Sequence, residues 1–402
     1  MTDDLELFRG KVREFVAWMC KEFPESTQPT SPDHPRAEVD PEIVRRYRTA
    51  QYDAGLAGLT WPREYGGQGL TREYQAIAAE EYAGLQQPGW RATLVAHGMC
   101  GPTILAFGTE EQKQRYIRPM LRGEEIWCQF FSEPGAGSDL AGLRTRARLE
   151  GDTWRVDGQK IWSSHARIAS FGVLLARTNP DVPKHRGITM FVVPTDAAGL
   201  EIRPIRQING GAEFNEAFFD DVRIPASAAL GGVDDGWRTT QYMLMNERTS
   251  ITESGGRSTG LDVAGLGELA RRAGVADNAW ARSRTAQVWA RERALELLAE
   301  DIADRVKAGS DPGPVGSVAK LMKAQIERQL VELSVDLAGA TGGYFSTPQI
   351  GGKYTGLTTA RATAIAGGTN EIQRNIIAER VLGLPRDDLA DRDVPFRDLA
   401  QG

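Results

Sequence analysis

The sequence predicts an α+β protein made of an N-terminal helical domain, a middle antiparallel β domain and a C-terminal helical bundle. Apolar residues recur every three or four positions in the first third of the chain, which is the period of an amphipathic helix. Residues 126–235 instead hold short runs rich in Val, Ile, Phe and Trp, a pattern typical of strands. Long helical segments return after Gly236-Trp237. We therefore expect domains over residues 1–125, 126–235 and 236–402.

The N-terminal helices are predicted from their apolar faces. In the segment 5–23 one face gathers the apolar side chains into a single stripe, formed by Phe8, Val12, Phe15, Val16 and Met19. Further helices are expected from Pro41, from Arg72 through the Ala-rich stretch 74–83, and over residues 103–106 and 110–121.

The strands of the middle domain are expected at the runs 127–132, 153–156, 160–163, 171–177, 188–194, 200–208 and 217–224. So many short runs in one stretch predict a compact antiparallel sheet. The C-terminal helices are expected over 239–248, 278–307, 318–338 and 370–381. Their length suits packing as a bundle.

Composition excludes several classes of function. The 402 residues include 48 Lys plus Arg against 54 Asp plus Glu, a formal net charge of −6, so the chain lacks the basic character of a nucleic-acid-binding protein. No stretch approaches the roughly 18 apolar residues that a membrane-spanning helix needs. The acidic start, Met1–Asp4, has no basic region or cleavage site, so we expect a cytoplasmic protein.

Few residues are available for metal or nucleophilic chemistry. The three cysteines, Cys20, Cys100 and Cys128, are far apart in the sequence and are expected to be buried or free thiols in a reducing compartment rather than a disulfide framework. The four histidines stand in no zinc-binding arrangement, so no metal site is expected, and no G-x-S-x-G motif predicts a hydrolase. The chemistry is therefore expected to come from an organic cofactor.

A glycine-containing loop, Glu133–Asp139, follows the first expected strand. Its Gly135-x-Gly137 pair begins like a dinucleotide-binding motif, but Leu140 stands where the third glycine belongs. A Rossmann fold is therefore disfavoured. Two interpretations remain: a plain Pro-Gly turn, or a loop whose glycines let backbone N–H groups approach a planar ligand, with Ser132 adding a hydroxyl.

Several motifs occur in the order and at the spacing of one known family. They are Trp61–Gly69, Gly108–Lys113, Ser132–Asp139, Gly158–Trp162, Phe219–Pro225 and Gly368–Arg374. Together they make the sequence resemble the acyl-CoA dehydrogenase family along nearly its whole length. The resemblance implies bound FAD, an acyl-CoA substrate and the three-part fold predicted above, with four helices in the C-terminal bundle.

The resemblance also implies which residues contact the cofactor. In the family, the hydroxyl residue before Glu-Pro, the residue preceding it and a Trp after the Gly-Gln-Lys turn lie beside the flavin. The expected FAD contacts are Gln129, Phe131, Ser132, Gly137, Ser138, Trp162, Ser164 and Thr369. Ser138 also matches a position near the thioester arm of the substrate. Without the resemblance, Trp162 would be assigned to ordinary core packing.

The catalytic base of many family members is a Glu immediately before the Gly-Thr of the C-terminal motif, where this sequence has Gly367. A second family location lies on the helix after the β domain, just before an Arg, and here it holds Glu247, followed by Arg248. Apolar neighbours at 242–245 suit a carboxylate that takes a proton once substrate excludes water. We expect Glu247 to be the base and Arg248 and Gly367 to contact substrate. The alternative is a solvent-facing Glu or a structural Glu–Arg pair.

Two departures from the family concern the subunit assembly. Family homotetramers use two C-terminal motifs to complete the FAD site of a neighbouring subunit. Here residues 277–284 lack the Arg-x-x-Phe-Gly pattern, and Asp336 replaces a Gln, so an acceptor that repels phosphate stands for an amide donor. Two assemblies stay open: a heteromer with a second acyl-CoA dehydrogenase-like subunit, and a homo-oligomer with altered contacts.

The leading functional hypothesis is FAD-dependent α,β-dehydrogenation of an acyl-CoA thioester, with an electron-transfer flavoprotein as the expected electron acceptor. One alternative is a flavin-dependent oxidase or monooxygenase of the same superfamily, which the retained Glu247 disfavours. Another is a non-catalytic subunit that completes the site of a different chain. Neither a nucleic acid nor a membrane is an expected partner.

Overall fold

The N-terminal third of the computed structural model is helical, as expected. Its helices are α1 (Thr2–Glu22), α2 (Pro41–Asp53), α3 (Arg72–Glu81), α4 (Trp90–Val95), α5 (Gly101–Phe107) and α6 (Glu110–Leu121). The structure describes residues 2–24, 39–83, 85, 87–253, 262–307, 314–339, 360–386 and 392–399. The stripe on α1 packs with Tyr47 and Ile77 in one hydrophobic cluster. The pattern did not predict α4, because six residues are too few to show a helical period.

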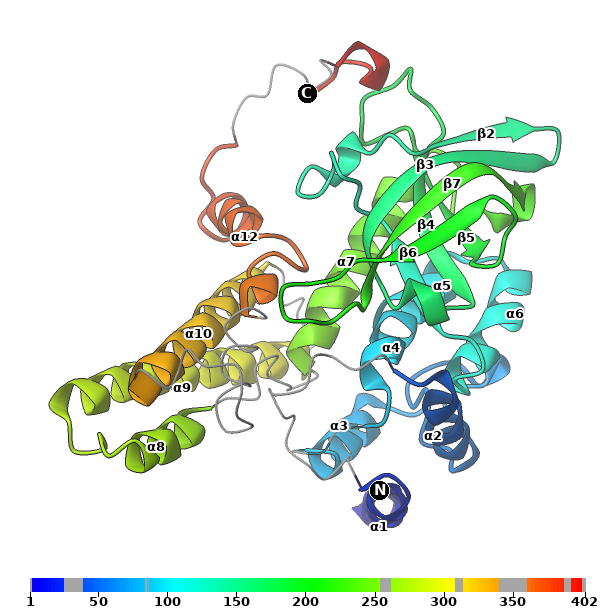
Figure 1. Cartoon of the computed structure of the whole chain (residues 1–402). Helices are drawn as coiled ribbons and strands as arrows, with labels where there is room; N and C mark the ends of the chain where they lie inside the picture. The colour runs from blue at the N-terminus through cyan, green and yellow to red at the C-terminus, as the bar shows by residue number, and fades with distance from the viewer. Residues whose placement is uncertain are drawn as a thin grey trace.

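The middle of the chain forms one seven-stranded sheet. Its strands are β1 (Trp127–Phe130), β2 (Arg146–Glu150), β3 (Thr153–Ser164), β4 (Phe171–Arg177), β5 (Ile188–Pro194), β6 (Leu200–Pro204) and β7 (Phe214–Pro225). The order is β1-β4-β2-β3-β7-β6, and β5 pairs with β4. Most pairs are antiparallel, but β1 and β2 run parallel to β4, so the sheet is mixed. Figure 1 shows helices of the N-terminal part against one side of this sheet.

The strand β3 corrects the expectation of two separate strands, 153–156 and 160–163. A register shift against β7 between Val156 and Gly158 lets the strand continue through the expected turn. Gly158 has a φ of +154°, and a Cβ there would lie 2.4 Å from Thr145 Oγ1, so only glycine fits. The pattern also missed β2, because nearly all of its residues are exposed and it offers no buried run.

The C-terminal helices are α7 (Gly236–Glu253), α8 (Val263–Arg272), α9 (Ala279–Lys307), α10 (Val315–Ala338) and α12 (Asn370–Ile376). α8, α9 and α10 share a hydrophobic cluster and project together away from the sheet, as Figure 1 shows. The helix expected over 370–381 is regular only to Ile376 and ends in a π-helical turn. None of the helices in the described ranges has the length and apolarity to span a bilayer.

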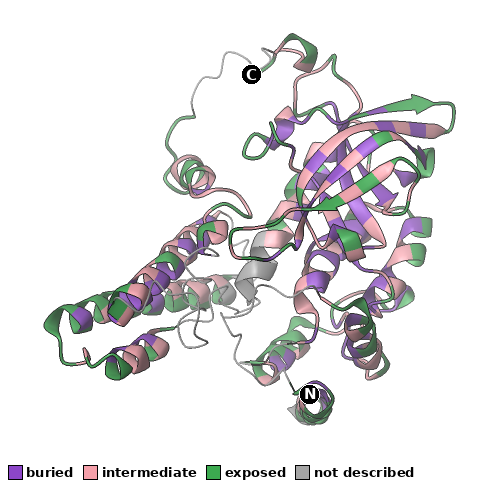
Figure 2. Cartoon of the chain, viewed as in Figure 1, coloured by how far each residue is buried: buried purple, intermediate pink, exposed green. Residues whose placement is uncertain are grey.

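Burial is concentrated in the sheet and in the helices that cover it, as Figure 2 shows. The outward surfaces of α8 and α9 are largely exposed. α7 joins the C-terminal helices to the sheet, since its Met243 is fully buried in the same cluster as Trp127 of β1 and Met190 of β5. This places the helix that carries Glu247 against the sheet.

Candidate functional site

The segment that follows β1 is held alongside β3 by two hydrogen bonds. The carbonyl of Phe131 accepts from Lys160 Nζ at 3.0 Å, and the carbonyl of Ser132 accepts from the backbone N–H of Ile161 at 2.9 Å. Phe131 is buried and Ser132 is half-buried. Phe131 and Ser132, which are expected to contact the flavin, therefore lie next to the part of β3 that carries Trp162.

A buried ion pair fixes this arrangement. Lys160 Nζ lies 2.8 Å from Glu133 Oε1, and the Glu133 carboxylate also accepts from the backbone N–H groups of Arg144 and Thr145, at 2.6 and 2.8 Å. Burial lowers the pKa of Lys160 to about 8, because the loss of hydration outweighs the attraction of Glu133. Burial alone would raise the pKa of Glu133, but the ammonium and the donated hydrogen bonds lower it.

Trp162 is presented to the surface by an unusual backbone conformation. Its φ is +64°, in the left-handed region that a bulky residue rarely adopts, and the register of β3 against β7 shifts between Lys160 and Ser163. The side chain is 53% exposed and forms a T-shaped pair with the ring of Phe214, with ring centroids 6.0 Å apart. This contradicts the alternative of ordinary core packing. Ser164 is half-buried and pairs with Phe214 across the strands.

The residues of this region fit a flavin ring. Gln129, on the strand that leads into the loop, has a buried Oε1 without a hydrogen-bond partner, and a buried acceptor of this kind calls for an N–H donor. A large exposed aromatic face at Trp162 suits stacking against a planar ring. Gly137 and Ser138 are exposed, and a Cβ at Gly137 would meet no atom within 4 Å, so the backbone there is open to a ligand.

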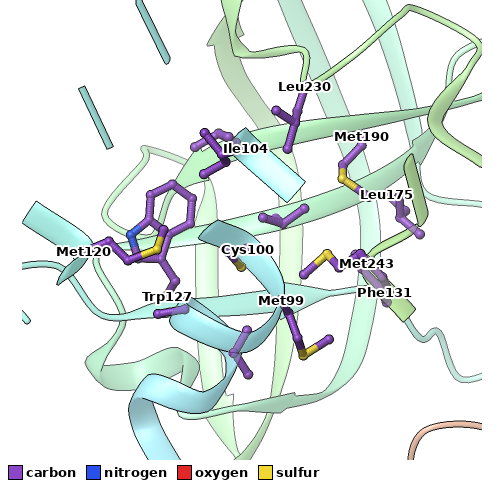
Figure 3. Packing of buried hydrophobic residues seen from close by; sticks show 14 of the residues in the cluster. Met99, Cys100, Ile104, Met120, Trp127, Phe131, Leu175, Met190, Leu230 and Met243 are labelled. Atoms are coloured by element: carbon purple, nitrogen blue, oxygen red, sulfur yellow. The ribbon is translucent and has the colours of Figure 1, made fainter. Parts of the chain in front are cut away.

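Glu247 lies on α7, one helical turn after Met243, which places the two residues on the same face of the helix. Met243 belongs to the same hydrophobic cluster as Phe131, as Figure 3 shows. Glu247 is half-buried. The structure therefore anchors the helix of the expected base and the loop of the expected flavin contacts in one core. The side chain of Arg248 lies outside the described residues.

The C-terminal motif forms a tight turn ahead of α12. Gly367 and Gly368 have φ values of +66° and +92°, and Thr369 caps the helix by accepting from the N–H of Ile372 at 3.2 Å. Fully buried Gln373 donates to the carbonyls of Gly367 and Gly368 at 3.1 and 3.2 Å. Gly367, where the resemblance places the catalytic Glu of many family members, thus lies in a left-handed glycine turn.

Sequence reasoning did not single out Lys160, Glu133 or Lys320 as functional residues. A signal for Lys160 exists: it falls on the same face of β3 as Trp154 and Val156, which are buried, so a charged residue there needs a buried partner. The sequence around Lys160 does not show which residue that partner is, because Glu133 lies 27 residues away.

Comparison with known proteins covers almost the whole chain. Family models of acyl-CoA dehydrogenase match at residues 2–124 for the N-terminal domain, 128–222 for the middle domain and 234–382 for the C-terminal domain. Acyl-CoA dehydrogenase IpdE1 of Mycobacterium tuberculosis is 39% identical over 385 residues, covering 96% of this chain and 99% of the relative.

Two solved complexes are similar in structure as well. The Tcur3481-Tcur3483 steroid ACAD has a TM-score of 0.81 at 30% identity, covering 96% of this chain and 98% of the other. The ChsE4-ChsE5 complex of Mycobacterium tuberculosis has a TM-score of 0.76 at 30% identity, covering 96% and 99%. Similarity in sequence and in fold therefore extends over the same three regions.

Proposed function

This chain belongs to the acyl-CoA dehydrogenase family, and on that premise we propose that it oxidises an acyl-CoA thioester to the 2-enoyl-CoA with FAD as cofactor and Glu247 as base. The observation that carries the site assignment is the common core of Phe131 and Met243. It ties the loop that suits the flavin to the helix that bears the carboxylate. The half-buried Glu247 and the exposed Trp162 disfavour the alternative of a non-catalytic subunit.

Removal of the substrate's α-proton is the step that this chain's residues must perform. The carbon acid is weak, so the base must be positioned and partly desolvated, and the developing negative charge on the thioester oxygen needs hydrogen-bond donors. Glu247 is half-buried on α7 and suits the first task. Backbone N–H groups of the Gly367 turn and the side chain of Arg248 are our candidates for contacting the substrate, together with Ser138. Bound FAD would supply the acceptor for the hydride that leaves the β-carbon.

We assign the cofactor contacts to the loop after β1 and to the bulged part of β3. Phe131, Ser132 and Trp162 would hold the ring, and the buried Oε1 of Gln129 would accept from it. Ser164 would contribute a hydroxyl, Gly137 has an open backbone, and Ser138 beside it is exposed. Thr369 is a further proposed cofactor contact, and its hydroxyl oxygen also accepts the N-capping hydrogen bond of α12.

We further propose that the active assembly is a heteromer with a second acyl-CoA dehydrogenase-like chain. α9 exposes the large apolar side chains Trp280, Trp289 and Leu297 on different sides of the helix, and subunit contacts would cover them. Asp336 is exposed at the end of α10, where the family has an amide donor for the FAD of a neighbouring subunit. A second copy of this chain would present the same acceptor to the phosphates, so a different partner chain would be needed to supply the donor. The two similar complexes, Tcur3481-Tcur3483 and ChsE4-ChsE5, each carry the names of two different proteins.

The similar Tcur3481-Tcur3483 complex is called a steroid ACAD, and on that basis we propose a bulky polycyclic acyl group as the substrate class. An electron-transfer flavoprotein is the proposed acceptor of the electrons. If the enzyme were an oxidase instead, the reduced protein would reoxidise rapidly in air with product bound. A dehydrogenase is expected to reoxidise slowly under the same condition.

The test is anaerobic bleaching of the flavin absorbance of the purified protein across straight-chain, branched, aromatic and steroid side-chain acyl-CoA thioesters. Glu247→Gln should retain the flavin and bleach at least about 1,000-fold more slowly, because the amide cannot accept the proton. Glu150→Gln, on the exposed face of β2, is the matched control and should bleach normally. Normal bleaching by Glu247→Gln would refute the base assignment.

A further inference from the structure

A lysine is buried among the C-terminal helices. Lys320, on α10, is only 7% exposed, and its Nζ donates to the carbonyl of Gly368 at 2.6 Å. Removing an ammonium group from water is destabilising unless the group is hydrogen-bonded and near negative charge. This hydrogen bond leads to the glycine turn, which stands where many family members are expected to have their catalytic Glu, so the position of this charge calls for an explanation.

The segment just before the glycine turn is also hydrogen-bonded to α10. Thr363 Oγ1 donates to Glu327 Oε2 at 2.7 Å, and Glu327 follows Lys320 by seven residues, which puts both on one face of α10. Gln373 adds its two hydrogen bonds from the α12 side. Because Gly367 and Gly368 have left-handed φ values, the turn depends on these tethers for a defined direction of its N–H groups.

The same ammonium lies within electrostatic reach of the proposed base. α10 packs against α7, and among the described residues the carboxylates of Glu247 on α7 and Glu371 on α12 attract the Lys320 ammonium. Burial lowers the pKa of Lys320, and the two carboxylates oppose that effect. Glu371 is largely exposed and ion-paired with Arg374 at 3.1 Å, so Glu247 is the more enclosed of the two carboxylates.

We propose that Lys320 is a positioning residue for the dehydrogenation: it fixes the Gly367–Gly368 turn and keeps a positive charge near Glu247, so that the carboxylate is ionised when substrate arrives. The proposal rests on the function proposed above. A residue that only holds the turn would affect substrate affinity. A residue that also supplies charge would affect the pH at which the base loses its proton, and this second effect separates the two roles.

Three variants separate the tether from the charge. Lys320→Met removes both, Lys320→Gln keeps a donor for the Gly368 carbonyl without charge, and Lys320→Arg keeps the charge. Flavin bleaching by a good acyl-CoA is followed by rapid mixing across a pH series. We expect the acid limb of the profile to move up by about one pH unit in the Met and Gln variants and to stay in place in the Arg variant.

Hydrogen exchange of the holoenzyme without substrate measures how firmly Lys320 holds the Gly367–Gly368 turn, independently of activity. The amides of residues 367–370 should lose protection in Lys320→Met and retain most of it in Lys320→Gln. Lys113→Met is the charge-matched control, since Lys113 pairs with Glu110 on α6, and it should leave both readouts unchanged.

Each outcome bears on a separate claim. If the acid limbs of the pH profiles of Lys320→Met and Lys320→Gln coincide with that of wild type, the role of the charge is overturned. If the amides of residues 367–370 keep their protection in Lys320→Met, the role of Lys320 in holding the turn is overturned. If Lys320→Met does not fold, Lys320→Gln against Lys320→Arg still decides the charge. Wild-type protein that no acyl-CoA bleaches would instead overturn the proposed function, and the exchange experiment would still judge the tether.

Discussion

The guanidinium carbon of Arg177 lies 3.8 Å from the centroid of the Phe396 ring, which joins the C-terminal segment 392–399 to the end of β4. Arg177 is 4% exposed and donates to the carbonyl of Ala141 at 2.6 Å. Burial lowers its pKa to about 10. The ring therefore covers a buried cation. The backbone N–H of Phe396 also donates to the Val182 carbonyl at 2.9 Å, so the segment is hydrogen-bonded to the loop between β4 and β5.

Replacing Phe396 with Ala should loosen the segment 392–399. The ring loses its cation–π contact with a desolvated guanidinium, so we expect a loss of about 1–2 kcal/mol of stability. The amides of Phe396 and Arg397, which donate to the Val182 and Pro180 carbonyls, should exchange faster with deuterium. Phe396→Tyr keeps the ring face and is the control. Unchanged exchange in Phe396→Ala would show that the backbone hydrogen bonds suffice.

Replacing Lys160 with Met should detach the loop after β1. The substitution leaves the buried carboxylate of Glu133 without its cation, at a cost of about 3–5 kcal/mol, and frees the Phe131 carbonyl. Urea denaturation should show the loss, and the purified protein should retain less flavin. In the double variant Lys160→Met/Glu133→Gln the charge is gone, so roughly 1 kcal/mol or more should return. No recovery in the double variant would argue against the ion pair as the cause.

Replacing Trp162 with Asn should separate fold stability from flavin binding. Asn tolerates the left-handed region better than Trp, and the lost side chain is already half exposed. We expect the flavin-free protein to be as stable as wild type or up to about 1 kcal/mol more stable, while flavin affinity falls at least about tenfold. Trp162→Phe, which keeps an aromatic face, should bind more tightly than the Asn variant. Equal affinities for all three proteins would contradict the stacking role.

His97 should make the protein sensitive to acid. Its Nε2 lies 2.9 Å from the Met120 carbonyl, so the neutral ring donates there, while burial and the nearby Arg48 cation lower its pKa to about 3. The unfolded chain, with the ordinary pKa near 6.5, binds the proton more strongly. The stability that this group contributes is therefore lost as pH falls through the window from 6.5 to 3, by about 2 kcal/mol between pH 7 and pH 5.

The measurement is urea denaturation of wild type and His97→Gln at pH 7 and pH 5. Gln keeps an N–H donor for the Met120 carbonyl and does not titrate, so the variant should lose less stability on acidification. An identical pH dependence in the two proteins would mean that other groups account for the acid sensitivity.

Much of the element plan could be predicted from the sequence, because local periodicity reports which face of a segment is buried. The stripe on α1 and the runs at β4 and β5 matched the structure for this reason. β2 and α4 were missed because one is almost wholly exposed and the other is too short to show a period. The expected turn at Gly158 became a bulge inside β3, since the partner strand β7, distant in sequence, continues the pairing on both sides.

The sequence by itself determined the family motifs, the helix–sheet–helix order and the candidate pair of Glu247 and the vacated Gly367. Only the tertiary structure decided that Trp162 points outward, that Lys160 meets Glu133 across 27 residues, and that Lys320 reaches Gly368 across 48. The reason is physical. Periodicity depends on the environment of each segment alone, whereas a buried charge is stabilised by whichever partner the packing of distant segments brings within hydrogen-bond distance.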